Sequence, residues 1–271
     1  MEAKTSNKSG LAKELGVSRS LLYYRRKQPD KDWKLKCEIE KVLREHPSYG
    51  HKRLAIHLKI NKKRALRVMR LFGIKPYRRR TKKYRKSKAK SEFTFPNLLM
   101  TTYPAYPNHI WASDFTHIRF NGKWVYLATI IDLFTRQVVG ISILTNHSNQ
   151  LVINALLNAV NKCPIAKIIH SDQGSEYTSA DYTTLCANLN IVQSMSNPGS
   201  PWENGYQESF YSQFKVDLGD PNRFNNLGEL VYNIYKTIYN YNNHRIHTKL
   251  KMPPVIYSRQ YLTNNLLERV S

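Results

Sequence analysis

The stretch "HIWASDFTHIRFNGKWVYLATIID" (109–132) decides the fold of this chain. Two runs rich in β-branched and aromatic residues lie on either side of Asn121-Gly122, a pair that favours a two-residue hairpin turn. A third run of this kind, "QVVGISIL" (137–144), follows the short turn at 134–136. These patterns predict three consecutive antiparallel strands.

Helical and strand patterns alternate after this meander. A helix is expected at 149–161, a fourth strand at "IAKIIHSD" (165–172), a helix at about 179–189, and a short strand at "IVQSMS" (191–196). A further helix should begin near residue 200. This order is typical of an α/β fold with a ribonuclease-H-like, mixed five-stranded sheet and helices.

The positive charge of the chain is concentrated in its first third. The net charge is +24, and residues 1–91 hold 30 Lys and Arg against 7 Asp and Glu, whereas residues 92–271 hold 13 against 12. Such asymmetry indicates a polyanion-binding module joined to a nearly neutral domain. A solubilising basic tail is the alternative, but the helical patterning of this segment favours a folded module.

The segment "SGLAKELGVSRSLLYYRRK" (9–27) has the spacing of a helix-turn-helix. Gly16 should close a first helix, and Ser18 should cap a second one. Arg19 and Ser20 would then lie near the start of the second helix, where recognition helices meet base edges. We therefore expect both residues to contact DNA.

A second helical set follows, with apolar residues at helical spacing between Ile39 and Phe72. Asn61 should cap its last helix and Gly73 should end it. Four cations beside the apolar stripe of that helix are predicted to contact phosphates: Lys62, Lys63, Arg64 and Arg67. The basic arm at 75–90 has no apolar period, so we expect it to order on nucleic acid through residues that include Arg78, Arg79 and Arg80.

These patterns divide the chain into four parts. We predict an all-α helix-turn-helix DNA-binding region at 1–74 and a basic arm and proline-punctuated linker at 75–108. The ribonuclease-H-like core domain is expected at 109–226. A helix from Leu227 to about Asn242 begins the C-terminal part, 227–271.

Two aspartates stand at strand positions where acids are costly or unusual. Asp114 lies in the middle of the first strand, and a buried carboxylate there needs a compensating cation. Asp172 ends the fourth strand, two residues before Gly174, at the carboxyl edge where α/β sites are built. Each position alone has a structural explanation, since an aspartate at a strand end often only caps a turn.

Two glutamates, Glu203 and Glu208, lie in the helix expected after residue 200. Glu203 fits the third position of that helix and should reach back to its Ser200 cap, with Pro201 at the first position. Glu208 is rotated by about 140° from Glu203. It should share its face with Tyr211, Ser212 and Lys215, and the lysine could bind a phosphate. The stripe formed by Tyr206, Phe210 and Phe214 should pack on the sheet. We therefore interpret Glu203 as a structural residue and Glu208 as a residue that takes part in the chemistry of the site.

Other polar residues have structural interpretations. His170 is expected to pack or to support the site, Asp132 to pair with Arg136, and Glu176 to lie on the surface. Cys37 has histidines nearby, but a single cysteine is a poor basis for a zinc site. The three cysteines are read as reduced packing residues.

Three motifs and their spacing resemble a known family. "WASDFT", "HSDQGSEY" and "GSPWENGYQESFYSQFK" are similar to the D,D-35-E (DDE) signature of insertion-sequence transposases related to retroviral integrases, with 57 residues between Asp114 and Asp172 and 35 between Asp172 and Glu208. The tail "YNNHRIHTKLKMPP" and the basic stretch "HPSYGHKRLAIHLKINKKRALRVMRLFGIK" also resemble family segments. The likeness covers nearly the whole chain and is closest to the OrfB-type transposases of the IS-three family.

This resemblance implies a reaction and a site. Asp114, Asp172 and Glu208 would be the catalytic residues and the ligands of two Mg²⁺ or Mn²⁺ ions, with Asp114 bridging both. Oxygen-only ligands suit these ions. Water would cut the 3′ ends of the element, and the freed 3′-hydroxyl would attack another DNA strand. Family members usually have Asp-Asn-Ala where this chain has Glu203, Asn204 and Gly205.

The resemblance also implies partners: double-stranded DNA, further copies of the chain on DNA, and an OrfA reading frame that acts beside or fused to this one. Arg245 and His247 of the tail are expected to be structural or to contact DNA. A non-catalytic regulator derived from a transposase and a simple nuclease of the same fold stay open as alternatives. No run approaches the roughly 18 apolar residues of a membrane helix, and no secretory signal is evident, so a bacterial cytoplasmic, nucleoid-associated protein is expected.

Overall fold

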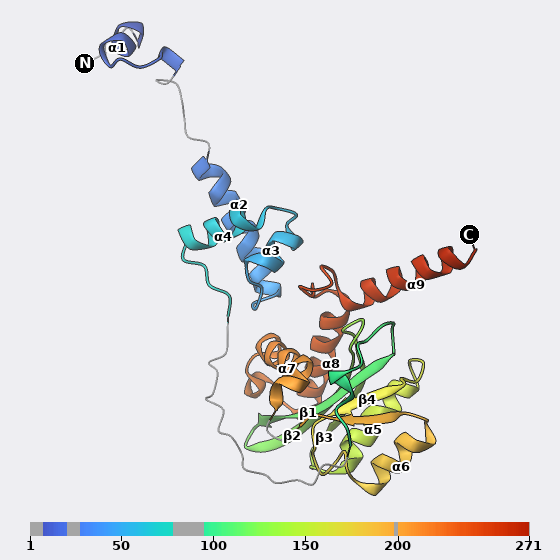
Figure 1. The fold of residues 1–271 in the computed structure, drawn as a ribbon. Helices are drawn as coiled ribbons and strands as arrows, with labels where there is room; N and C mark the ends of the chain where they lie inside the picture. The colour runs from blue at the N-terminus through green and yellow to red at the C-terminus, as the bar shows by residue number, and fades with distance from the viewer. Residues whose placement is uncertain (1–7, 21–27, 78–94, 198–199, 271) are drawn as a thin grey trace.

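The computed structural model describes residues 8–20, 28–77, 95–197 and 200–270 (Figure 1). A group of helices from the first third of the chain stands over a sheet-based domain, and the last helix projects from the junction between them. Within the described ranges, none of the helices has the length and apolar character needed to cross a membrane.

The helical region contains α1 (Lys8–Glu14), α2 (Gln28–Glu45), α3 (His51–His57) and α4 (Lys62–Leu71). The side chain of Asn61 accepts a 2.8 Å hydrogen bond from the Lys63 backbone N–H, and Gly73 follows the helix with a φ of 64°. Both predicted ends of α4 are thus confirmed. Gly16 also has a positive φ after α1, but the second helix expected after Ser18 falls on 21–27, outside the described residues.

The sheet has five strands in the order β3-β2-β1-β4-β5. They are β1 (Ile110–Phe120), β2 (Lys123–Asp132), β3 (Val138–Leu144), β4 (Ile168–Ser171) and β5 (Val192–Met195). The first three strands pair in antiparallel fashion, whereas β4 and β5 are parallel to β1. The predicted mixed five-stranded sheet is therefore confirmed, with Asn121 and Gly122 both at positive φ in the β1–β2 turn, as a tight hairpin requires.

Helices cover both faces of this sheet. One face packs on α5 (Asn149–Val160) and α6 (Ala180–Asn188), and the other on α7 (Gly205–Leu218) and α8 (Leu227–Asn243) (Figure 1). A Cβ on Gly140 of β3 would lie 2.4 Å from the carbonyl oxygen of Ala155, so only glycine lets α5 approach this strand so closely.

Short segments connect these elements and close the chain. Among them are the 3₁₀ turns η2 (Leu98–Met100), η3 (Pro201–Asn204) and η4 (Pro221–Arg223). The last helix is α9 (Pro254–Val270). The linker before β1 lies along β5, because the backbone N–H of Met195 donates to Pro96 O and that of Leu98 to the Ser194 hydroxyl.

The buried face of α7 differs from the predicted one. Phe210 and Phe214 are buried as expected, but Tyr206 is 42% exposed. Tyr211, which was expected to share the face of Glu208, is buried instead. The helical spacing was correct, but the polar groups of the sheet beneath attract a tyrosine hydroxyl that the pattern alone would leave in solvent.

Candidate active site

The sheet topology brings Asp114 and Asp172 together. The pairing of β1 with β4 runs as far as Ala112 opposite His170. Asp114 lies two residues further along β1, and Asp172 directly follows the last residue of β4. Neighbouring strands are separated by about 4.8 Å. Because the paired register ends just before them, the two aspartates flank the point where β1 and β4 part.

Local backbone geometry fixes each aspartate. The Asp114 carboxylate accepts a 2.8 Å hydrogen bond from the Phe115 backbone N–H, and that of Asp172 accepts one of 3.1 Å from Gly174 N–H. A Cβ on Gly174 would lie 2.8 Å from Glu176 Oε2 and 3.1 Å from Asp172 Oδ1. The glycine therefore allows the chain to turn against its own carboxylates.

Glu208 comes from α7, which is tied to β1 and β2 by buried hydrogen bonds. Gln207 Nε2 donates to Ala112 O at 2.6 Å, and the Tyr211 hydroxyl donates to Asp114 O at 2.7 Å. The Thr129 hydroxyl lies 2.9 Å from that of Tyr211. Glu208 itself is exposed between these anchors. Gln207 was not singled out from the sequence and Tyr211 was expected beside Glu208, although their spacing of four residues places both on one helix face.

The three acids share an electrostatic neighbourhood. The pKa of Asp114 is raised to about 8, first by burial and then by the charges of Asp172 and Glu208, while Phe115 N–H and Lys215 act in the opposite direction. Burial likewise raises the pKa of Asp172, with a contribution from Glu176. Asp114 is thus the carboxyl group that the folded chain least favours in its charged form, as expected of a site that needs a compensating cation.

The donor chemistry of this cluster suits a hard divalent cation, because every side-chain ligand is a carboxylate oxygen. Among the residues that the structure describes, however, no three His, Cys, Asp or Glu side chains converge closely enough to hold an ion together. Like charges repel, so holding three carboxylates nearer to one another has a cost that a bound cation would offset.

Glu203 is a structural residue, but it does not form the expected capping box. Its carboxylate accepts hydrogen bonds from the backbone N–H and side-chain amide of Asn197 and from the amide of Asn97 at 2.6, 3.0 and 2.7 Å. It does not reach back to Ser200, because 201–204 form a 3₁₀ turn and α7 begins only at Gly205. Glu203 therefore joins the linker to the loop before α7.

Two other structural expectations were wrong. The carboxylate of Asp132 accepts hydrogen bonds from Phe134 N–H and from the backbone and hydroxyl of Thr135, whereas the buried Arg136 guanidinium lies 4.1 Å from the Tyr206 ring centroid. The Asp132 carboxylate thus accepts the hydrogen bonds of the turn that follows it. Glu176 is buried rather than on the surface, and it lies 2.5 Å from His147 Nε2.

The histidine and arginine that were expected to be structural are buried. His170 lies with its Nδ1 2.9 Å from the Ser194 hydroxyl, and burial lowers its pKa to about 4. Arg245 is 3% exposed and binds Asp217 and Gln213 of α7. Both residues therefore support the core and α7 rather than reaching outward.

The predicted DNA-contacting residues lie in different settings. Arg19, Ser20, Lys62, Lys63 and Arg64 are exposed, whereas Arg78, Arg79 and Arg80 lie outside the described residues. Arg67 is exposed but forms a two-pronged ion pair with the buried Asp32, at 2.5 and 2.7 Å. Its guanidinium is therefore already engaged by a carboxylate, which makes it a weaker candidate for phosphate contact than its neighbours.

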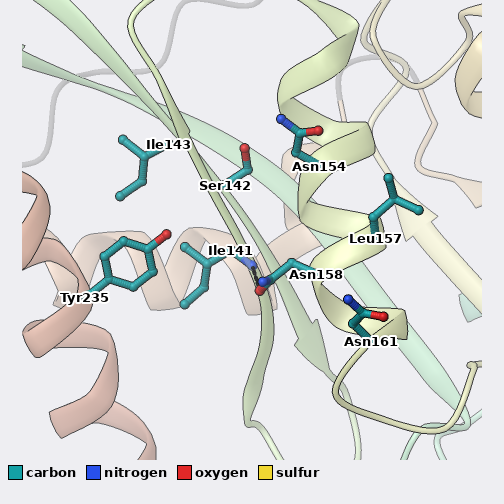
Figure 2. Close-up of a pocket in the computed structure, with 8 residues that line it drawn as sticks. All are labelled: Ile141, Ser142, Ile143, Asn154, Leu157, Asn158, Asn161 and Tyr235. Carbon is teal, nitrogen blue, oxygen red and sulfur yellow. Dashed lines mark hydrogen bonds between the residues drawn. The ribbon is translucent and has the colours of Figure 1, made fainter.

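A separate hollow of about 390 Å³ lies beside the edge strand β3 (Figure 2). Ile141 and Ser142 line it from β3, Asn154 and Asn158 from α5, and Tyr235 from α8. Asn158 accepts a hydrogen bond from Ile141 N–H at 3.1 Å, so it covers part of the strand edge. None of the three elements carries an acid of the Asp114 cluster.

Comparison with known proteins agrees with this architecture. Residues 104–201 and 189–254 each match the family described as integrase core domain. A chain of the simian T-cell lymphotropic virus intasome, in complex with PP2A regulatory subunit B56 gamma, superposes with a TM-score of 0.52 at 18% identity, covering 78% of this chain and 70% of that one. The fold is thus that of the proteins built on an integrase catalytic core.

Relatives along the full chain narrow the class to a family. The putative transposase InsK of insertion sequence element IS150 from Escherichia coli K12 is 32% identical over 257 residues, which cover 90% of each chain. The transposase InsF of IS3A from the same organism is 39% identical over 117 residues, or 42% of this chain and 41% of that one. This chain belongs to the DDE transposases of the IS-three family of insertion sequences.

Proposed function

We propose that this chain cuts the 3′ ends of an insertion element and joins the freed ends to another DNA strand, with Asp114, Asp172 and Glu208 as its catalytic residues. One observation carries the proposal. Asp114 of β1 lies where β1 and β4 part, and the charges of Asp172, just after β4, and of Glu208 on α7 both act on its carboxyl group.

The chain's own residues position these carboxylates. Hydrogen bonds from Phe115 N–H and Gly174 N–H orient Asp114 and Asp172, and Gln207 and Tyr211 hold α7 on the strand of Asp114. Since catalytic geometry must be held within fractions of an ångström, these supports are part of the site.

We assign Mg²⁺ or Mn²⁺ as cofactor, two ions for each site, held by Asp114, Asp172 and Glu208. Such ions would activate the attacking oxygen, stabilise the leaving oxygen and neutralise the phosphate charge. The charge of Lys215 lowers the pKa of Asp114, and we assign this lysine to bind a DNA phosphate next to the reacting one.

The remaining assignments concern DNA and protein partners. Double-stranded DNA, both element ends and target, would be bound by the basic first third of the chain, including Arg19, Ser20, Lys62, Lys63 and Arg64. We infer that several copies assemble on DNA, since two ends must be brought together, and that an OrfA reading frame assists as partner or fusion.

A single assay distinguishes this function from its alternatives. The chain is incubated with Mg²⁺, a labelled duplex that carries the terminal sequence of its element, and an unrelated target duplex. Nicking at the 3′ end followed by a joined product is expected, and EDTA should abolish both. Hydrolysis without joining would instead indicate a nuclease, and binding without either reaction a regulator.

A further inference from the structure

The helical region and α7 are joined by two residues of the C-terminal tail, Arg245 and Ile246. Arg245 donates to Asp217 and Gln213 of α7, both at 2.5 Å. The N–H of Ile246 donates to the Tyr49 hydroxyl at 2.7 Å. Tyr49, Arg245 and Ile246 are all at least nine-tenths buried. The tail therefore fixes the segment before α3 against the helix of Glu208.

Two further contacts complete this joint. The Ser48 hydroxyl donates to Asp217 at 3.1 Å, and Arg53 Nε donates to Ile246 O at 3.1 Å. Ile246 also packs in the apolar core of α2–α4. Residues far apart in the sequence thus hold α3 and α7 at a fixed separation, and a groove between them has a defined shape.

That groove has a volume of about 550 Å³. One wall is formed by His51, Lys52 and Arg53 at the start of α3, and the other by residues of α7 that include Ser212 and Gln213. Ser212 lies one turn after Glu208, or about 6 Å along the helix axis. Tyr77 also lines the groove, so the groove adjoins the point where the chain enters the basic segment from Arg78 onward.

The charges around the groove are unbalanced. Lys52, Arg53 and Arg245 are cationic, and Asp217 is the one acid among the groups described in the joint and the groove walls. Burial and the nearby charge of Arg245 lower the pKa of Arg53. Within the described chain the hydrogen bond of Arg53 to Ile246 uses only Nε, which leaves both terminal nitrogens for another acceptor. An anion in the groove would relieve this excess.

We infer that the groove between α3 and α7 binds the phosphate backbone of double-stranded DNA, leading it from the helical region toward Glu208. Lys52 and Arg53 would contact phosphate oxygens from the α3 side, and Ser212 would line the path on the α7 side. This inference rests on the proposed function, because the DNA is the element end on which the acids act. It adds Lys52, Arg53 and Ser212 to the DNA-contacting residues predicted above, and it links the helical region to α7 by one DNA path.

Two variants and two matched controls test the groove. Lys52→Ala removes an exposed cation from the groove, and Lys41→Ala removes an exposed cation from α2 in the same helical region. Ser212→Trp fills the groove without changing charge, and Thr263→Trp places the same ring on an exposed position of α9. All four positions are exposed, so folding should be retained, and thermal melting checks this.

The full chain is titrated with the labelled element-end duplex at several salt concentrations. Lys52→Ala should lower the slope of log affinity against log salt by about 0.9, as expected for one lost phosphate contact. Ser212→Trp should weaken binding by about tenfold through steric exclusion. Both controls should bind like the wild-type chain.

The outcomes separate this inference from the proposed function. If the wild-type chain binds and cuts the duplex but either groove variant behaves like its control, the groove assignment is wrong and the function stands. If the wild-type chain neither binds nor cuts the duplex, the proposed function fails and the groove assignment fails with it.

Discussion

The hydroxyl of Tyr211 donates a 2.7 Å hydrogen bond to the backbone carbonyl oxygen of Asp114. This bond joins the helix that carries Glu208 directly to the strand residue that should share its cations. The two acids are therefore positioned by one buried contact as well as by the sheet.

Replacing Tyr211 by Phe should weaken this positioning while keeping the ring packed. We expect a loss of about 1 kcal/mol in stability and a fall of roughly tenfold or more in 3′-end cleavage, because residues that orient metal ligands typically carry effects of that size. Cleavage rates at saturating Mg²⁺ and urea denaturation measure the two effects. Tyr232→Phe, at an exposed position of α8, is the control; equal cleavage by both variants would contradict the positioning role.

Glu208→Gln should abolish both cleavage and strand transfer. The loss should exceed the roughly 10- to 100-fold expected for residues that only orient a ligand, because the substitution would remove one of the proposed ligands. DNA binding should persist, since Glu208 is exposed and its replacement should leave the fold intact. Gel-shift and cleavage assays on one preparation test both statements, and substantial residual cleavage would exclude the assigned role.

Glu203→Gln should act on stability instead. An amide in place of this carboxylate sets one NH₂ group against the donors of Asn97 and Asn197, at a cost of about 1–3 kcal/mol. The melting temperature should fall by roughly 2–4 °C for each kcal/mol, with cleavage reduced far less than in Glu208→Gln. Equal loss of cleavage from the two substitutions would overturn the division between them.

Gly205→Ala should be tolerated and slightly stabilising. A Cβ at Gly205 would meet no atom within 4 Å, and the residue begins α7, where alanine has the higher helix propensity. We expect a gain of about 0.5–1 kcal/mol with unchanged cleavage. A loss of stability measured by thermal unfolding would show that this turn needs glycine for another reason.

Arg245→Met should loosen the joint between the helical region and α7. The change leaves Asp217 in a largely buried position without its cation, at a cost of about 3–5 kcal/mol. The double variant Arg245→Met, Asp217→Leu should recover part of this loss, because it removes the unpaired charge. Urea denaturation of the wild-type chain, the single variant and the double variant measures these free energies of unfolding. A loss below about 1 kcal/mol in the single variant would mean that the pair does not support the joint.

Acid should destabilise the same joint through His46, which stacks on Tyr49 with ring centroids 4.4 Å apart. The pKa of His46 is lowered to about 4, first by burial and then by the charges of Arg245 and His57. The unfolded chain therefore binds more protons between about pH 6.5 and 4, so stability is lost as pH falls through this window.

At pH 5 the imidazole of residue 46 is largely protonated in the unfolded chain but largely neutral in the folded one, so protonation favours unfolding. His46→Phe keeps a stacked ring and should reduce the fall in melting temperature between pH 7 and pH 5, whereas the exposed His244→Phe should not. An unchanged pH dependence in His46→Phe would assign the acid effect to other groups, such as His170 and His247, whose pKa values burial lowers in the same direction.

Local sequence signals were enough to predict the sheet, the order of its helices and the candidate acids. Alternating apolar residues and Asn121-Gly122 specify a hairpin whatever surrounds them, and the spacing of Asp114, Asp172 and Glu208 is a property of the chain. The same local chemistry specified both ends of α4.

The tertiary structure alone decided which side chains support the site. Gln207 and Tyr211 could be placed on a helix face from the sequence, but only the packed sheet supplies the carbonyl oxygens that accept their hydrogen bonds. Glu203 was expected to cap its own helix, yet Asn97 and Asn197 offer more donors. Asp132 and Arg136 were expected to pair, whereas the Asp132 carboxylate accepts hydrogen bonds within its own turn and the Arg136 guanidinium lies against the Tyr206 ring.

The joint between α3 and α7 could not be predicted from the sequence either. It depends on Tyr49 meeting Arg245 and Ile246, almost 200 residues later in the chain. No periodicity links such distant residues, because the contact is set by how the folded parts pack against each other. Local patterns therefore identified the elements and the acids, and long-range packing selected the residues that position them.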